Sequence, residues 1–146
     1  MKDKDFEMIM GFPRIFHVLM GKMMHGFESS QKDMTLNQTQ RRTLFIIHNK
    51  KVMTMTALHE IIGLEKGSLT AVIDQLIAKG LVKRERDEKD RRRVNISLSA
   101  KGKRKVKILR MEIGGHIKEK LERLPAEERE RFYRTVESLM DISRKL

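Results

Sequence analysis

Apolar positions recur with helical spacing along most of the chain and with strand spacing in one short stretch. Positions 69, 72, 73, 76 and 77 are apolar, which predicts an amphipathic helix that Lys79 and Gly80 end. From 94 to 98, apolar and polar residues alternate with the period of a half-buried strand. We therefore expect a β-hairpin over 80–98. Because its turn lacks an Asn-Gly or Asp-Gly pair, residues 87–93 should form a protruding loop.

Helices are expected on both sides of this hairpin. Residues 6–27 are apolar almost all round, which suggests burial against a second subunit, and Pro13 should split them into two helical pieces. Asn37 and Thr54 are candidate N-caps of two short helices, and Gly63 should end the second. Together with the helix from Lys66, this gives a helix-turn-helix pattern. Ser99 should cap a long helix, and Pro125 should be the first residue of the last one.

The formal charge of +12 is concentrated in one segment. Residues 79–110 contain 14 Lys and Arg against 4 Asp and Glu, so they hold +10 of it. A solvated basic face and an acidic membrane surface are alternatives, but a local footprint of this size favours nucleic acid. The hairpin, the helix before it and the basic start of the helix after it should form one continuous surface.

Several classes of protein do not fit the composition. The chain has no apolar run long enough to cross a membrane, and its first residues include acids, so we expect a cytoplasmic protein. Without cysteine, disulfides and thiolate metal sites are excluded. The five histidines are scattered, and no catalytic motif is present, so we expect no enzyme, no metal site and no cofactor.

The chain resembles the MarR-type winged-helix transcription regulators over almost its whole length. The resemblance lies in Leu36-Asn37-Gln38-Thr39-Gln40, in Asp74-Gln75-Leu76, and most specifically in Asp87-Glu88-Lys89-Asp90-Arg91-Arg92 followed by a strand and Ser-Ala-Lys-Gly. It implies a mainly α fold with a small β-hairpin (α+β), in a single domain over 1–146. Residues 1–35 and 100–146 would be dimerisation helices, and 36–99 a winged helix-turn-helix lobe.

The resemblance also implies a function. It suggests a homodimeric repressor that binds a pseudo-palindromic operator in double-stranded DNA and is released by a small-molecule ligand. The alternative is a ligand- or protein-binding module whose basic patch meets RNA or an acidic protein. Phe16, Met20, Met24 and His48 are the candidate ligand-pocket residues.

Position by position, the resemblance assigns roles to individual residues. The helix from Lys66 would be the recognition helix, with Ser68, Thr70 and Ala71 facing bases and Gln75 nearer phosphate. Arg92 would enter the minor groove, while Asp87 and Asp90 would hold the loop in shape. The remaining candidate DNA contacts are Lys66, Arg84, Arg91 and Arg93. Two positions depart from the family pattern, because Ala71 stands where many members have arginine and Lys66 where many have proline.

Overall fold

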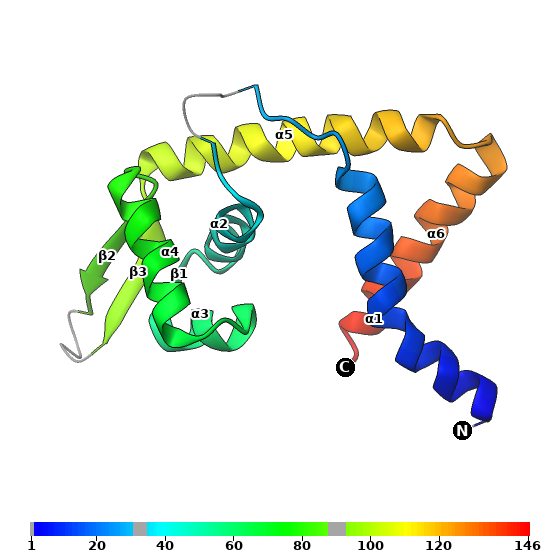
Figure 1. The fold of residues 1–146 in the computed structure, drawn as a ribbon, viewed down its shortest axis with the longest axis horizontal. Helices are drawn as coiled ribbons and strands as arrows, with labels where there is room; N and C mark the ends of the chain where they lie inside the picture. The colour runs from blue at the N-terminus through cyan, green and yellow to red at the C-terminus, as the bar shows by residue number, and fades with distance from the viewer. Residues whose placement is uncertain (1, 31–34, 88–92) are drawn as a thin grey trace. The chain divides into compact units, whose positions relative to one another are not determined.

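The computed structural model of the 146-residue chain describes residues 2–30, 35–87 and 93–146 (Figure 1). In chain order the elements are α1 (Asp3–Met24), α2 (Gln38–Lys50), β1 (Val52–Thr54), α3 (Met55–Ile62), α4 (Lys66–Ala78), β2 (Val82–Arg86), β3 (Val94–Leu98), α5 (Ala100–Glu122) and α6 (Ala126–Ser143). The chain divides into two compact units. Unit 1 is Met1–Glu28 with Glu112–Leu146, and unit 2 is Ser29–Met111.

Helix ends in unit 2 are fixed by the capping residues that the sequence predicts. The Asn37 side chain accepts a 2.8 Å hydrogen bond from the Gln40 backbone N–H, and the Gln40 side chain accepts one from the Asn37 N–H, which completes a capping box. The Thr54 hydroxyl accepts a 3.2 Å bond from the Ala57 N–H, and Gly63, at φ 72°, ends α3. These local predictions are confirmed.

Two local predictions need correction, and one short strand was not predicted. Helix α1 is continuous through Pro13. Proline removes only one backbone bond, and Ile9, whose carbonyl loses its donor, lies in an exposed part of the helix where water can satisfy it. Strand β1 was not predicted, because three residues are too few to show an alternation. Pro125 lies at the N-cap of α6, one residue before the expected position.

The core lies in unit 2 and is built by α2 to α4, the sheet and the start of α5. The sheet is antiparallel in the order β1-β3-β2, with Arg84 and Met53 opposite Ile96 on either side. The residues of the core that are at most 1% exposed are Leu44, Ile47, Leu58, Leu69, Ile73, Leu76, Leu81, Ile96, Val106 and Leu109. The expected fold class, mainly helical with a small β-hairpin, is confirmed, and the hairpin is part of a three-stranded sheet.

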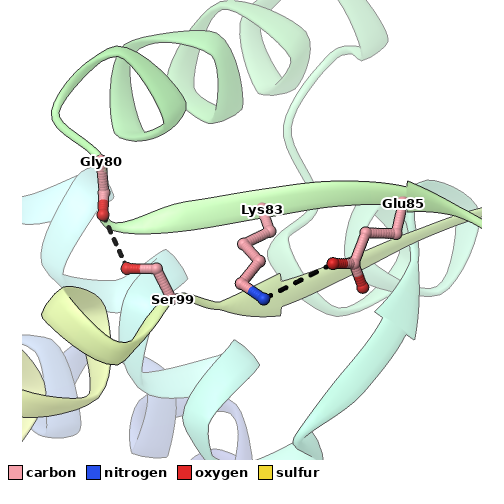
Figure 2. A network of polar contacts seen from close by, with 4 residues as sticks. All are labelled: Gly80, Lys83, Glu85 and Ser99. Carbon is pink, nitrogen blue, oxygen red and sulfur yellow. Dashed lines mark hydrogen bonds and ion pairs between the residues drawn. The ribbon is translucent and has the colours of Figure 1, made fainter.

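Ser99 joins the hairpin to α5. Its hydroxyl donates a 2.6 Å bond to the Gly80 carbonyl (Figure 2) and accepts a 2.9 Å bond from the Gly102 N–H. Its own N–H donates to the Leu81 carbonyl at 3.0 Å. A Cβ atom on Gly102 would lie 2.9 Å from the Leu81 carbonyl carbon and closer still to its oxygen. The backbones of the two segments therefore meet where only glycine fits.

Unit 1 is built from α1, α6 and the second half of α5, and it buries little by itself. Neither α1 nor α6 contains a buried residue. The end of α1 is held to α5 by the Lys120 ammonium, which donates to the Lys22 carbonyl at 2.9 Å, and by an edge-on contact between the Phe27 and His116 rings. Large apolar side chains stay exposed along α1, with Met8 64% and Ile15 63% exposed.

Candidate nucleic-acid interface

Two strips of exposed polar and small side chains run along the solvent-facing surface of helix α4. Leu69, Ile73 and Leu76 are buried, which fixes the rotation of the helix. One strip carries Lys66 and Thr70, whose hydroxyl donates a 3.0 Å bond to the Lys66 carbonyl. The other strip carries Ser68, Ala71 and Gln75, all exposed. The side chains predicted to contact DNA on this helix are therefore all at the surface.

Gln75 is held in place by α2. The Gln40 side-chain amide donates a 2.7 Å bond to the Gln75 side-chain oxygen. Gln40 is only 4% exposed and is also the capping-box residue of α2. The Gln40 side chain accepts a bond at the start of α2 and donates one to Gln75 in the second half of α4, so it couples the two helices. The Gln75 NH₂ group is left to donate outward. The capping-box spacing marks Gln40 in the sequence, but its bond to a residue 35 positions away is not a local signal.

Arg84 on β2 is fixed against α4 by an ion pair. Its guanidinium lies 3.1 Å from the Asp74 carboxylate, with the two side chains 37% and 56% exposed. From the sequence, we expect Asp74 to pair with a neighbouring arginine, and it does so with Arg84. At this exposure the pair adds little to stability, but it orients the Arg84 side chain toward α4.

The base of the hairpin loop is closed by Asp87 and its neighbours. The Asp87 N–H donates a 3.0 Å bond to the Arg93 carbonyl, and the Asn95 side chain donates a 2.9 Å bond to the Asp87 carboxylate. Asp87 therefore makes contacts suited to shaping the loop. Three predicted residues, Asp90, Arg91 and Arg92, lie outside the described residues.

A surface groove of about 860 Å³ brings together four of the predicted DNA contacts, Lys66, Thr70, Arg84 and Arg93. They come from the first turns of α4, from β2 and from the residue before β3. The complete lining is Thr54, Met55, Thr56, Ala57, His59, Glu60, Lys66, Leu69, Thr70, Arg84, Arg93 and Val94. Three cations and several hydroxyls around one opening suit the binding of phosphate groups. The α3 residues of the lining were not predicted as site residues.

The four residues predicted for a ligand pocket are divided between the two units. Phe16, Met20 and Met24 lie on α1 in unit 1, where Phe16 is 53% exposed. His48 lies on α2 in unit 2, and its Nε2 is 3.3 Å from the Arg110 guanidinium. The pocket itself stays a prediction.

Residues 2–30, 35–87 and 93–146 contain neither a candidate metal site nor a candidate membrane span. No three His, Asp or Glu side chains in these ranges are close enough together to hold a metal ion. No helix formed by the same residues is both long and apolar enough to cross a membrane.

Comparison with known proteins identifies relatives over the helix-turn-helix and wing. The family model described as the MarR family matches residues 36–94. The HTH-type transcriptional regulator SarZ of Staphylococcus aureus strain MRSA252 is 33% identical over 89 residues, which are 61% of this chain and 60% of SarZ. SarZ of strain USA300 is 32% identical over the same extent. The match thus spans about 60% of the length of these relatives.

Solved structures extend the similarity of fold to nearly the whole chain. A cysteine-to-serine mutant of MarR from E. coli has a TM-score of 0.76 at 20% identity, covering 88% of this chain and 95% of that protein. The same mutant in complex with operator DNA has a TM-score of 0.66 at 21% identity, covering 92% and 96%. The transcriptional regulator BldR from Sulfolobus solfataricus has a TM-score of 0.70 at 25% identity and covers both chains completely. Residues 36–94 therefore match the MarR family in sequence, and the chain as a whole has a winged-helix fold like that of MarR.

Proposed function

We propose that the chain is a sequence-specific regulator of transcription that binds double-stranded DNA through α4 and the wing, the hairpin of β2 and β3. The observation that carries this proposal is the convergence of Lys66, Thr70, Arg84 and Arg93 on one groove. A helix with small and polar side chains at its exposed first turns can enter the major groove, because close approach to base edges needs such side chains. The cations beside it can neutralise phosphates on either side.

The relatives support the same conclusion. SarZ is described as a transcriptional regulator, and the MarR mutant was crystallised with operator DNA. The MarR family model covers residues 36–94 of this chain, which contain α4 and β2. By analogy, Ser68, Thr70 and Ala71 would face the bases, Gln75 would lie nearer phosphate, and Arg92 would enter the minor groove.

The proposed regulator is a homodimer in which residues 1–35 and 100–146 form the interface and 36–99 the DNA-binding lobe. Support comes from the apolar surface of unit 1, where α1 and α6 expose side chains such as Ile9 and Met140, each more than half exposed. Contiguous apolar surface of this kind marks an interface. Two lobes related by a two-fold axis would read half-sites about 34–36 Å apart in a pseudo-palindrome. We further propose that the dimer represses transcription in the cytoplasm and that a small ligand releases it from DNA.

The groove can be tested by charge removal with a matched control. The variant Lys66→Ala with Arg93→Ala removes two exposed cations of the groove. The control, Arg42→Ala with Lys50→Ala, removes two exposed cations of α2 that lie outside both the groove and the proposed dimer interface. Binding to the DNA upstream of the protein's own gene would be measured by fluorescence anisotropy over a series of salt concentrations. The groove variant should reduce the slope of log K against log salt by about 2, since each phosphate contact contributes about 0.9.

The control variant should keep the wild-type slope. Equal slopes for all three proteins would exclude the groove from the interface. Random duplex and RNA serve as competitors in the same assay. If RNA displaces the upstream DNA more effectively than random duplex does, the chain is an RNA-binding module and not a DNA-binding regulator.

A further inference from the structure

The first three turns of α5 present a row of cations to solvent. Between Ser99 and Met111 the chain has six Lys and Arg residues and no Asp or Glu. Lys105 points into unit 2 and is only 3% exposed. The other five are exposed and together form what we call the α5 ridge: Lys101, Lys103, Arg104, Lys107 and Arg110.

The five cations of the ridge form no ion pair with residues in the described part of the chain. The ion pairs there involve other cations, on β2 and in the second half of α5 and α6. Lys101 donates to the Lys79 carbonyl at 3.1 Å, and Arg110 contacts His48. Because cations near a helix N-terminus oppose the helix dipole, such a row costs stability in the isolated protein. The backbone N–H groups at the start of α5 are served by Ser99, so the feature is one of side chains and not of an open helix end.

The ridge starts at the opposite end of α4 from the groove. Lys101 bonds to Lys79, just beyond the last residue of α4, whereas the groove contains Lys66, the first residue of α4. Thirteen helical residues separate these ends by about 20 Å. Figure 1 shows the start of α5 beside one end of α4 and α3 beside the other. The groove and the ridge therefore lie at opposite ends of α4 in unit 2.

The chemistry of the ridge favours a nucleic-acid backbone over an acidic protein. Stable protein interfaces are anchored by aromatic or aliphatic side chains. Residues 101–107 of α5 expose cations and no large apolar side chain. Lys103, Lys107 and Arg110 form a row of about 10 Å along the helix, which can face roughly three phosphates of one strand, since these are about 3.4 Å apart along the duplex axis.

We propose that the α5 ridge binds the phosphate backbone of a second segment of duplex DNA, independently of its sequence. The first segment is the one held by α4 and the wing, so this proposal rests on the proposed function for that duplex. A duplex held at the groove end of α4 leaves the ridge, about 20 Å away along the helix, accessible to another duplex. The consequence is a protein that can bring two DNA segments together.

A two-duplex capture experiment tests this proposal. Biotinylated upstream DNA is fixed to beads and loaded with protein, and a fluorescent duplex of unrelated sequence is added at about 0.15 M salt. The ridge variant is Lys103→Ala, Arg104→Ala and Lys107→Ala. Its control, Arg42→Ala, Lys50→Ala and Lys51→Gly, removes the same charge from exposed positions of unit 2 outside the ridge, the groove and the proposed dimer interface. Far-UV circular dichroism checks that each variant is folded.

Wild type and control should capture the fluorescent duplex. At equal amounts of protein on the beads, the ridge variant should capture roughly tenfold to a hundredfold less, because three phosphate contacts are lost. Equal capture by wild type and ridge variant would overturn the proposal, as would no capture by bead-bound wild type or a preference for polyglutamate or RNA over duplex.

Protein that is washed off the beads would count against the proposed function and not against the ridge, because sequence-independent binding is weak, with a Kd of about 10⁻⁴ to 10⁻⁶ M, and does not survive washing. In that case the proteins are titrated directly with fluorescent duplex. The ridge variant should then lower the salt slope by about 3, while Lys66→Ala with Arg93→Ala leaves it unchanged. A ridge variant with the wild-type slope would refute the ridge as a DNA site.

Discussion

Replacing Gly102 by alanine should destabilise the protein although alanine is the better helix former. A Cβ at this position would overlap the Leu81 carbonyl, a backbone group that cannot turn aside as a flexible side chain could. The same carbonyl accepts the Ser99 N–H, so moving it also strains the junction between the hairpin and α5. Overpacking of a tight contact lowers the free energy of unfolding by up to about 3 kcal/mol. The higher helix propensity of alanine compared with glycine offsets about 1 kcal/mol of this loss.

The net loss of about 2 kcal/mol corresponds to a melting temperature lower by roughly 4 to 8 °C for a chain of this length. Gly114 provides the matched control in the same helix, since a Cβ there would meet no atom within 4 Å. Gly114→Ala should therefore raise stability by up to about 1 kcal/mol. Both variants would be melted by circular dichroism at one protein concentration, because melting of an oligomer depends on concentration. If Gly102→Ala melts at or above wild type, the inferred close approach of the two backbones is wrong.

Three further predictions follow from contacts described above. Asn37→Ala removes the cap of α2 and should cost about 1 kcal/mol in urea unfolding, whereas an unchanged midpoint would mean that the capping box with Gln40 contributes nothing. Arg84→Ala and Asp74→Ala both break the same exposed ion pair and should each cost less than about 1 kcal/mol, but only Arg84→Ala should weaken duplex binding and lower its salt slope by about 1. Ile15→Glu places a charge on the apolar face of α1 and should give a monomer in light scattering. A persistent dimer would move the interface elsewhere.

Features governed by short stretches of sequence were predictable. The caps at Asn37, Thr54 and Ser99 and the strand 94–98 follow from side-chain chemistry within a few residues, and the structure confirms them. Pro13 shows the limit of local rules, because α1 runs through it for 22 residues although proline in a helix interior costs about 3 kcal/mol.

Features that depend on contacts distant in sequence were not predictable. The bond from Gln40 to Gln75 joins residues 35 apart, and no periodicity marks it. The separation of the basic segment into a groove and a ridge depends on the course of α4, which charge counting along the sequence cannot show. The close approach at Gly102 likewise appears only when α5 is packed on the hairpin.

The bonding of Ser99 restricts what evolution can place at this position. One hydroxyl donates to the Gly80 carbonyl and accepts from the Gly102 N–H, so the residue there must supply a donor and an acceptor from a single short side chain. Aspartate and asparagine at this site could cap the helix but would present an oxygen or a displaced amide to Gly80, and alanine would satisfy neither group. Threonine alone keeps both functions. Among relatives, variation at position 99 should therefore be confined to these two hydroxyl residues, even though the position lies at the surface.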